Sequence, residues 1–295
     1  MTPNLFTPPE YDEALCRLAI GVELVDALDA LPTYGGGRYQ RNAAVLDERH
    51  PSPLHQWRRW AAGQTLNDVL AGLDRHRSGR FAHLYGTAPD PHDENLTVRI
   101  VEPRASTGRY LVPRRLRLRL YDDPVPDPPP DPGNQRIFRV GMFPGAGAYP
   151  SSGSTVLRGR VVRPGADGEL HPVRWVRVVA RDTLDDLGWA HGDDRGEFVL
   201  ILGSPAGAGT MPVDPLPVEL TLTLPPAVTA DPADVLLKVV DPLWDLPVQT
   251  AIATDDPSTD PVLTGRGPWP GTPFGPFAAP VPLGRESTVT IQLPA

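Results

Sequence analysis

Proline occupies 38 of the 295 positions and glycine another 28, and this restricts the possible folds more than any other feature of the chain. Because proline lacks an amide hydrogen and breaks helices, long helices are not expected, while edge strands and extended connections must be numerous. A hydrophobic content of 40% is still enough for buried cores. The length corresponds to about two domains. We therefore expect an all-β chain of small modules.

The most regular part of the sequence runs from Ser154 to Leu224. A strand is expected from Val156, followed by turn residues at 164–168, where glycine can adopt positive φ. Alternation over Val173–Ala180 predicts a second strand. The apolar run 198–202 and the alternating run 218–224 predict two more. Short strands separated by turns indicate a small antiparallel β-sandwich.

This succession of motifs resembles a known family. GRVV, a turn, a strand carrying VRVVARD and then DDRGEFVLIL are similar to the carboxypeptidase regulatory-like (prealbumin-like) β-sandwich. The resemblance covers about a quarter of the chain and transfers no catalytic residue. It implies a non-catalytic module that holds other parts in position.

The N-terminal half carries a weak copy of the same pattern. Ser78-Gly79-Arg80-Phe81 resembles Arg195-Gly196-Glu197-Phe198, and each opens a short apolar run that leads on to an alternating strand. This suggests two related sandwiches in tandem, although two similar stretches can also arise by chance in a β-rich chain. Leucine and valine at helical spacing over residues 65–76 predict one short amphipathic helix.

The expected fold class is therefore all-β, with tandem small antiparallel β-sandwich modules, Pro-rich linkers and one short helix. Four segments follow from the composition: an N-terminal β-module with the helix (1–121), a Pro/Asp-rich linker with a connecting strand (122–153), the regulatory-like sandwich (154–240), and an extended Pro/Gly/aromatic ribbon ending in a strand (241–295).

The run RRLRLRL at 114–120 is the most sharply alternating strand. Period 2 places Arg115, Arg117 and Arg119 on the face opposite the leucines. The favoured interpretation is a solvated outer face that discourages aggregation, and the alternative is a basic stripe for an acidic partner. The formal net charge of −8 disfavours nucleic acid as that partner.

The C-terminal ribbon carries Trp269, Phe274 and Phe277 among prolines and glycines. Its composition indicates a segment that cannot form a strand ladder and that drapes over another surface, in its own chain or in a neighbour. The last strand, at 287–293, is expected to complete a sheet. The three arginines of the stripe and these three aromatic residues are the predicted partner-binding residues.

Catalytic and metal-binding patterns do not emerge from the sequence. Seven histidines are scattered without metal-ligand spacing, and His191, close to Asp193 and Asp194, fits a surface turn. The single cysteine, Cys16, cannot form an intrachain disulfide or a thiolate zinc site alone. No serine-nucleophile or phosphate-loop signature is present. We expect no enzyme, no cofactor and no metal.

Neither a secretory signal nor an apolar run long enough to span a membrane is recognisable, which predicts a cytoplasmic protein, free or within an assembled particle. The segments YLVPRRLRLRL, LRGRVV and GWAHGDDRGEF resemble accessory proteins of phage-tail-like contractile injection systems. This resemblance implies a structural subunit that docks onto other protein subunits or onto copies of itself. The alternative is a carbohydrate- or peptide-binding β-module in which the six tryptophans supply stacking platforms.

Overall fold

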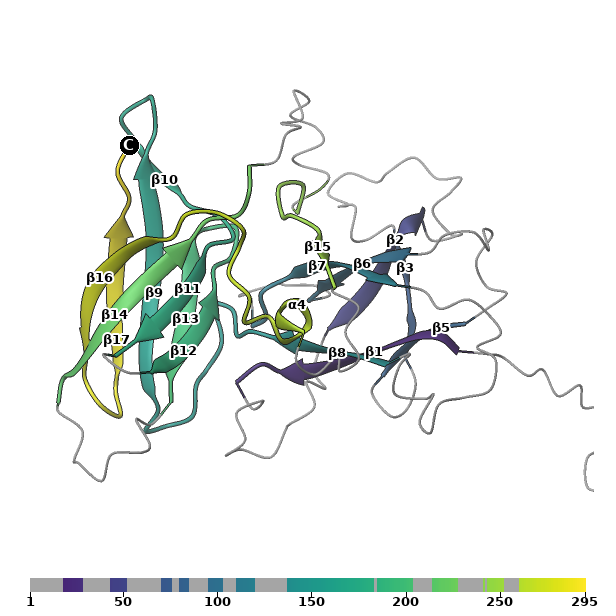
Figure 1. Cartoon of the computed structure of the whole chain (residues 1–295), viewed down its shortest axis with the longest axis horizontal. Helices are drawn as coiled ribbons and strands as arrows, with labels where there is room; N and C mark the ends of the chain where they lie inside the picture. Colours follow the sequence, from purple (N-terminus) through teal and green to yellow (C-terminus); the bar gives the residue numbers. More distant parts are fainter. Residues whose placement is uncertain are drawn as a thin grey trace, which may run out of the picture.

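The computed structural model describes residues 18–28, 43–51, 70–75, 80–84, 95–102, 110–119, 137–182, 185–203, 214–227, 241, 243–251 and 260–295. Residues 1–17, residues 122–136 of the Pro/Asp-rich linker, Trp57, Trp60 and residues 228–240 lie outside these residues. The described strands form two β-sandwiches, which lie side by side in Figure 1 with α4 (Pro261–Thr264) between them.

Two sheets enclose the core of the first sandwich. One has the order β4 (Asp74–Arg75), β5 (Phe81–Leu84), β1 (Leu18–Asp26), β8 (Ile137–Met142). The other has the order β15 (Gln249–Thr250), β7 (Arg114–Arg119), β6 (Asn95–Val101), β2 (Ala44–Pro51), β3 (Leu70–Gly72). Alternation decides which side chains face inward, so that Leu116 and Leu118 of β7 are fully buried while Arg117 and Arg119 are exposed.

The second sandwich is built in the same way. Its first sheet joins β10 (Leu170–Pro172), β9 (Thr155–Pro164) and β13 (Glu197–Leu202), and β17 (Glu286–Gln292) pairs with β9. Its second sheet has the order β12 (Asp186–His191), β11 (Arg177–Arg181), β14 (Leu216–Thr223), β16 (Phe274–Val281). Inward-facing residues such as Phe198, Leu200, Leu220 and Leu222 fill the core between the two sheets.

The structure confirms the expected fold class. The described part of the chain is nearly all β, in two tandem sandwiches, with one short helix. Most strand pairs are antiparallel, but β1 with β8, β7 with β15, and β9 with β17 pair in parallel. Within the described residues, no helix has the length and apolar character needed to cross a membrane.

The predicted helix at 65–76 is wrong for the residues that the structure describes. There, β3 pairs with β2 in one sheet and β4 pairs with β5 in the opposite sheet, and the chain crosses between the two sheets at Leu73. Leu70 and Leu73, spaced as on one face of a helix, are both buried. Leu70 lies in β3, and Leu73 lies where the chain crosses between the two sheets. Tertiary pairing therefore overrides the local helical pattern. The one described helix, α4, lies far away along the chain.

The expectation that the ribbon cannot form a ladder is also wrong. β16 pairs with β14 along its length, and its prolines are tolerated because it is an edge strand. The expected final strand is confirmed, since β17 pairs with β9. The four-segment division itself stays a prediction, but the sheets draw on several of its segments: β8, from the expected linker, completes a sheet of the first sandwich.

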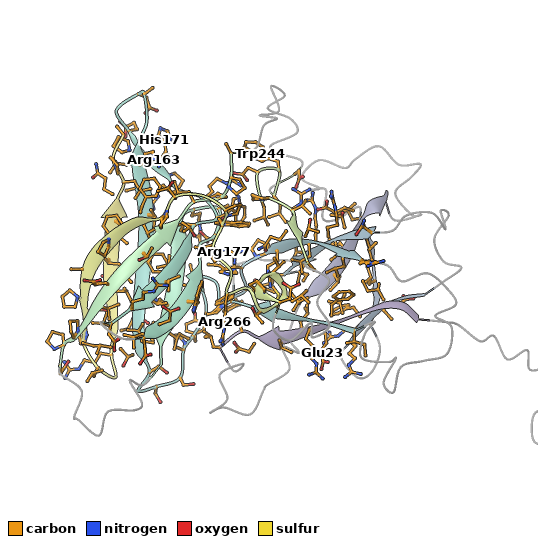
Figure 2. All side chains as sticks on the ribbon, in the orientation of Figure 1. Glu23, Arg163, His171, Arg177, Trp244 and Arg266 are labelled. Carbon is orange, nitrogen blue, oxygen red and sulfur yellow. The ribbon has the colours of Figure 1, made fainter. Side chains whose placement is uncertain are left out.

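The strand expected over Val173–Ala180 begins only at Arg177. Residues 173–176 form a turn in which Trp175 has a φ of 59°, a left-handed conformation that is uncommon for a bulky residue. This turn lies at the end of the second sandwich that faces the first, and Arg177 follows it directly (Figure 2).

Candidate functional site

The surface between the two sandwiches is a buried seam, which we define by an apolar cluster and two polar networks. The apolar cluster takes Leu46, Leu70 and Val101 from the first sandwich, Trp175 from the second, and Leu243, Leu246 and Trp269 from the C-terminal segment. Three separate parts of the chain therefore exclude water at one place. The two sandwiches are joined by a continuous hydrophobic contact in addition to their covalent connection.

Trp269 belongs to the apolar cluster of this seam. Its side chain is 5% exposed, and its Nε1 donates a hydrogen bond to the carbonyl oxygen of Trp175 at 2.6 Å. The guanidinium carbon of Arg177 lies 4.3 Å from the centre of one of its rings, within cation–π distance. The Nε1 of Trp175 in turn donates to Asp245 at 2.8 Å. Both indoles are buried with their polar atoms satisfied, as is usual for buried tryptophan.

The first polar network contains two buried arginines and a buried histidine. Arg177 is within hydrogen-bond distance of the Nε2 of His191, and it donates to the carbonyl oxygen of Gly265 at 3.2 Å. The Nε2 of His191 lies 2.7 Å from that same carbonyl oxygen. Arg114 and Arg177 both donate to the side-chain oxygen of Gln249, at 3.2 Å and 3.1 Å. Gln249 therefore bridges a cation from each sandwich.

Arg114 also closes the end of α4. Its guanidinium donates to the carbonyl oxygens of Leu263 at 3.1 Å and Gly141 at 2.7 Å, and it contacts that of Val262. A cation suits the C-terminal carbonyls of a helix, which have no partners within the helix. At the other end of α4, the Asp260 side chain accepts from the amide of Val262 at 2.7 Å and caps the helix.

Burial controls the ionisation of this network. Burial lowers the pKa of Arg114 to about 9, although the charge of Asp260 opposes the shift. Burial, followed by the charge of Arg114, holds the pKa of Arg177 well below its ordinary value. Burial and the charges of Arg177 and Arg114 hold the pKa of His191 well below 6.5. His191 is therefore neutral at pH 7, stacked on Phe143 with the ring centroids 3.9 Å apart.

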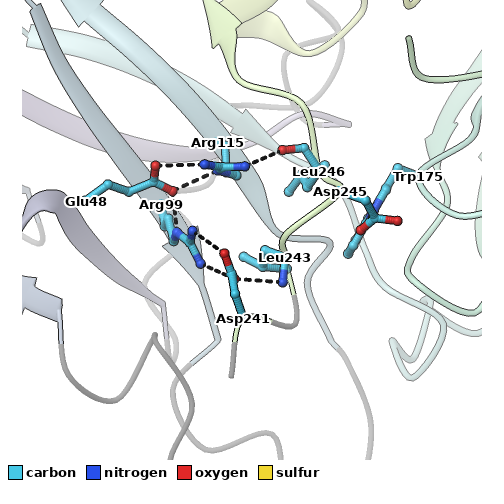
Figure 3. Close-up of polar contacts among 8 residues, drawn as sticks. All are labelled: Glu48, Arg99, Arg115, Trp175, Asp241, Leu243, Asp245 and Leu246. Atoms are coloured by element: carbon cyan, nitrogen blue, oxygen red, sulfur yellow. Dashed lines mark hydrogen bonds and ion pairs between the residues drawn. The ribbon is translucent and has the colours of Figure 1, made fainter. Parts of the chain in front are cut away.

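The second polar network lies beside the apolar cluster (Figure 3). Arg99 binds Asp241 through two hydrogen bonds, at 2.5 Å and 2.9 Å, and also pairs with Glu48. Arg115 binds both oxygens of Glu48, at 2.8 Å and 2.9 Å, and donates to the carbonyl oxygen of Leu246 at 2.8 Å. Burial acts to raise the pKa of Asp241, but the hydrogen bond and charge of Arg99 outweigh it and hold that pKa below its ordinary value.

The predicted partner-binding residues fall into different environments. Trp269 is buried in the seam, and Arg115 is used within the chain to bind Glu48 and Leu246. Arg117 and Arg119 are exposed on the outer face of β7. Phe274 and Phe277 lie on β16, half-buried against the core of the second sandwich. The structure does not bring the six together, and the binding of a partner by any of them stays a prediction.

His191 corrects the interpretation of its turn. It is 3% exposed and belongs to the seam, whereas the sequence placed it in a surface turn. The role of Asp193 follows from backbone needs, as expected, because its Oδ1 accepts from the amides of Arg195 at 2.8 Å and Glu197 at 3.0 Å. No local signal marks Arg114, Arg177 or His191 as one cluster, because their shared partners lie far away in the sequence.

Within the described residues, no group of three or more histidine, cysteine, aspartate or glutamate side chains could hold a metal ion. Trp175 and Trp269 are buried and do not offer stacking platforms, while Trp189 and Trp244 are half-buried. A shallow, open groove of about 240 Å³ lies on the outer face of β9, β13 and β17, lined among others by Arg158, Arg160, Glu197, Thr288 and Thr290.

Comparisons with known proteins give little beyond this. No family model matches the chain, and no curated protein matches it. Among solved structures, it is similar to GBS52, the minor pilin of Streptococcus agalactiae, with 10% identity, coverage of 93% of this chain and 94% of that one, and a TM-score of 0.25. It is also similar to a candidate adhesin from Bacteroides ovatus, with 9% identity, coverage of 83% and 91%, and a TM-score of 0.21. Likeness at this level assigns neither a family nor a function.

Proposed function

We propose that this protein is a non-catalytic structural subunit that docks into a larger protein assembly in the cytoplasm. The observation that carries the proposal is the seam, in which Trp269, Arg114 and Arg177 contact residues of both sandwiches. We infer that the chain therefore presents its outer faces as a single rigid body. A rigid body loses little conformational entropy when it is incorporated into an assembly. Two linked sandwiches without such a seam would lose more conformational entropy, because their relative orientation would become fixed only on incorporation.

The buried charges support the same function. Arg114 and Arg177 donate to backbone carbonyl oxygens and to Gln249 inside the chain, and in both networks the partners come from distant segments. Charged groups arranged in this way fix geometry more than they add stability, because their desolvation offsets much of their attraction. In the finer form of the proposal, the assembly is a phage-tail-like contractile injection particle, as the sequence resemblance implies.

Mass photometry tests this proposal. The purified protein is measured alone and after incubation with lysate of its own source. We expect species heavier than those of the purified protein to appear only with lysate. Their identification by mass spectrometry as tail or baseplate components would support the finer form. A protein that gains no mass in lysate would overturn the assembly function.

Charge reversal locates the docking face. Arg117 on β7 and Arg181 on β11 are both exposed arginines on strands, one in each sandwich. If the arginine face of β7 contacts the partner, Arg117→Glu removes the heavy species, whereas Arg181→Glu, with the same change in charge, retains them. Equal behaviour of the two variants would exclude this face as the docking surface.

A further inference from the structure

We propose that β17 is a self-association edge, which pairs antiparallel with β17 of a second copy of the chain. The β9 sheets of the two copies would then form one continuous sheet. The inference rests on this strand alone and does not require the proposed function. It starts from the position of β17, which pairs with β9 on one side and, within the described residues, with no strand on the other. An open strand edge is a template for pairing with another chain.

The hydrogen bonds between β17 and β9 show which residues of β17 direct their backbone N–H and C=O groups toward the open edge. The carbonyl oxygen of Arg285 accepts from the amide of Val156 at 3.0 Å, and the amide of Leu293 donates to the carbonyl oxygen of Val162 at 2.8 Å. Odd-numbered residues therefore point their backbone groups toward β9. Because the direction alternates along a strand, the even-numbered residues Glu286, Thr288, Thr290 and Gln292 point theirs away from β9.

Several other edges in the described structure are blunted. β16, on the same flank of the sandwich, carries Pro276 and Pro280 and a glycine with a φ of 118°, all of which disfavour a further ladder. β4, β10 and β15 have only two or three residues. α4 packs on the edge strand β8. β17 has seven residues, ESTVTIQ, with no proline or glycine, and four of them are β-branched.

The sequence of β17 is complementary to itself in one register. If Val289 faces Val289 of the second copy, all seven residues overlap, and the outward backbone groups form hydrogen-bonded pairs: Thr288 with Thr290, and Glu286 with Gln292. The only charged side chain of the strand then faces an amide, and no like charges stand opposite one another. In the same register, the half-buried Val289 of each copy gains an apolar neighbour.

The partner is therefore a second copy of this chain, related by a two-fold axis at Val289, which is the usual symmetry of a self-complementary patch. Thr288 and Thr290 are exposed and lie beside Arg158 and Arg160 of β9. Acidic residues at these two positions would be compatible with the folded monomer, because the adjacent arginines offer opposite charge. This makes a test possible in which the fold is kept and only the pairing across the axis changes.

Sedimentation velocity on the full chain provides the test. We expect wild type to dimerise at protein concentrations of up to about 100 µM. T288E/T290E should raise the dimer Kd by more than about tenfold, because the introduced glutamates of the two copies would face each other across the axis. T288E/T290K should dimerise again, since each glutamate would then face a lysine. Circular dichroism and thermal melting check that all three proteins are folded.

Three outcomes would overturn the inference: a wild type that stays monomeric over that range, a T288E/T290E variant that still dimerises, or a T288E/T290K variant that stays monomeric. The last would exclude the register centred on Val289. All three concern the isolated protein. Recruitment into a larger assembly is read from the lysate experiment and can succeed or fail independently.

Discussion

Buried charge is the distinctive feature of this protein at the scale of single residues. Arg114, Arg177 and His191 share a site from which water is largely excluded, with Asp260 as the carboxylate whose charge acts on Arg114. The Nε of Arg114 has no hydrogen-bond partner there among the described residues. Backbone carbonyls and Gln249 compensate most of the remaining donors. A neutral His191 belongs to this balance, because a third positive charge would have no partner.

We expect acid to destabilise the protein through His191. The folded-state pKa of His191 lies well below 6.5, so that below about pH 6.5 the unfolded chain binds a proton that the folded chain does not. Stability should therefore fall as pH falls, by up to about 1.4 kcal/mol per pH unit from this group. H191Q, which keeps a polar group near Gly265, should lose this part of the slope. Urea unfolding at pH 7.5 and pH 5 measures it, and parallel pH profiles for the two proteins would contradict it.

The ion pair of Arg99 and Asp241 should contribute far more to the stability of the fold than an exposed ion pair does. Arg99 has a side chain 3% exposed and Asp241 one 10% exposed, so D241N leaves a buried guanidinium with weaker acceptors and should cost about 1.5–3 kcal/mol. The control is D186N, which weakens the exposed pair between Arg181 and Asp186 and should change stability by less than about 0.5 kcal/mol. Both are read from denaturant midpoints. Similar losses of stability in the two variants would contradict the idea that burial in the seam makes the Arg99–Asp241 pair the more important one.

At the scale of elements, α4 is a wedge of four residues between the sandwiches. It is too short to be stable alone, so its conformation depends on the Asp260 cap, on Arg114 at its C-terminal carbonyls and on its contact with β8. Gly265 ends the helix with a φ of 71°, and a Cβ there would lie 2.7 Å from the ring of Phe143. The helix therefore ends where the seam begins.

The contact of α4 with β8 depends on a glycine. A Cβ on Gly141 would lie 2.5 Å from the carbonyl oxygen of Thr264 and 3.2 Å from the Cβ of Ala27. G141A should therefore displace α4 and cost more than about 2 kcal/mol. Gly72, on β3, is the matched control, because a Cβ there meets only Leu46 at 4.0 Å. Thermal unfolding compares the two, and a G141A variant as stable as G72A would contradict this packing.

At the scale of the whole molecule, the C-terminal segment ties the two sandwiches together. After β14 the chain supplies β15 to the first sandwich, then α4 and Trp269 to the seam, and finally β16 and β17 to the second sandwich. Arg266 adds a hydrogen bond back to the carbonyl oxygen of Ala27 at 3.2 Å, and Figure 2 places its label between the two halves. Neither sandwich is complete without residues from this segment.

Calorimetry should reveal this coupling. We expect wild type to unfold in one cooperative transition. W269A removes a buried indole and its hydrogen bond to Trp175, so it should lower the free energy of unfolding by about 3–5 kcal/mol and separate the transitions of the two sandwiches. W269F keeps an aromatic ring beside Arg177 and should retain a single transition at lower temperature. Two transitions in wild type, or one unchanged transition in W269A, would show that the seam does not couple the sandwiches.

Composition and local pattern were sufficient to predict the all-β class and the strands β7, β9, β13, β14 and β17. For β7 they also predicted the opposite faces of its leucines and arginines, because side-chain direction in a strand repeats every two residues whatever the neighbours are. The tertiary structure alone decided that residues 70–75 extend two sheets, that the proline-rich β16 forms a ladder and that His191 is buried. It also brought Arg114 to α4 and Arg177 to Gly265, across 149 and 88 residues. Local periodicity carries no information about contacts over such separations, which depend on where the sheets place each segment.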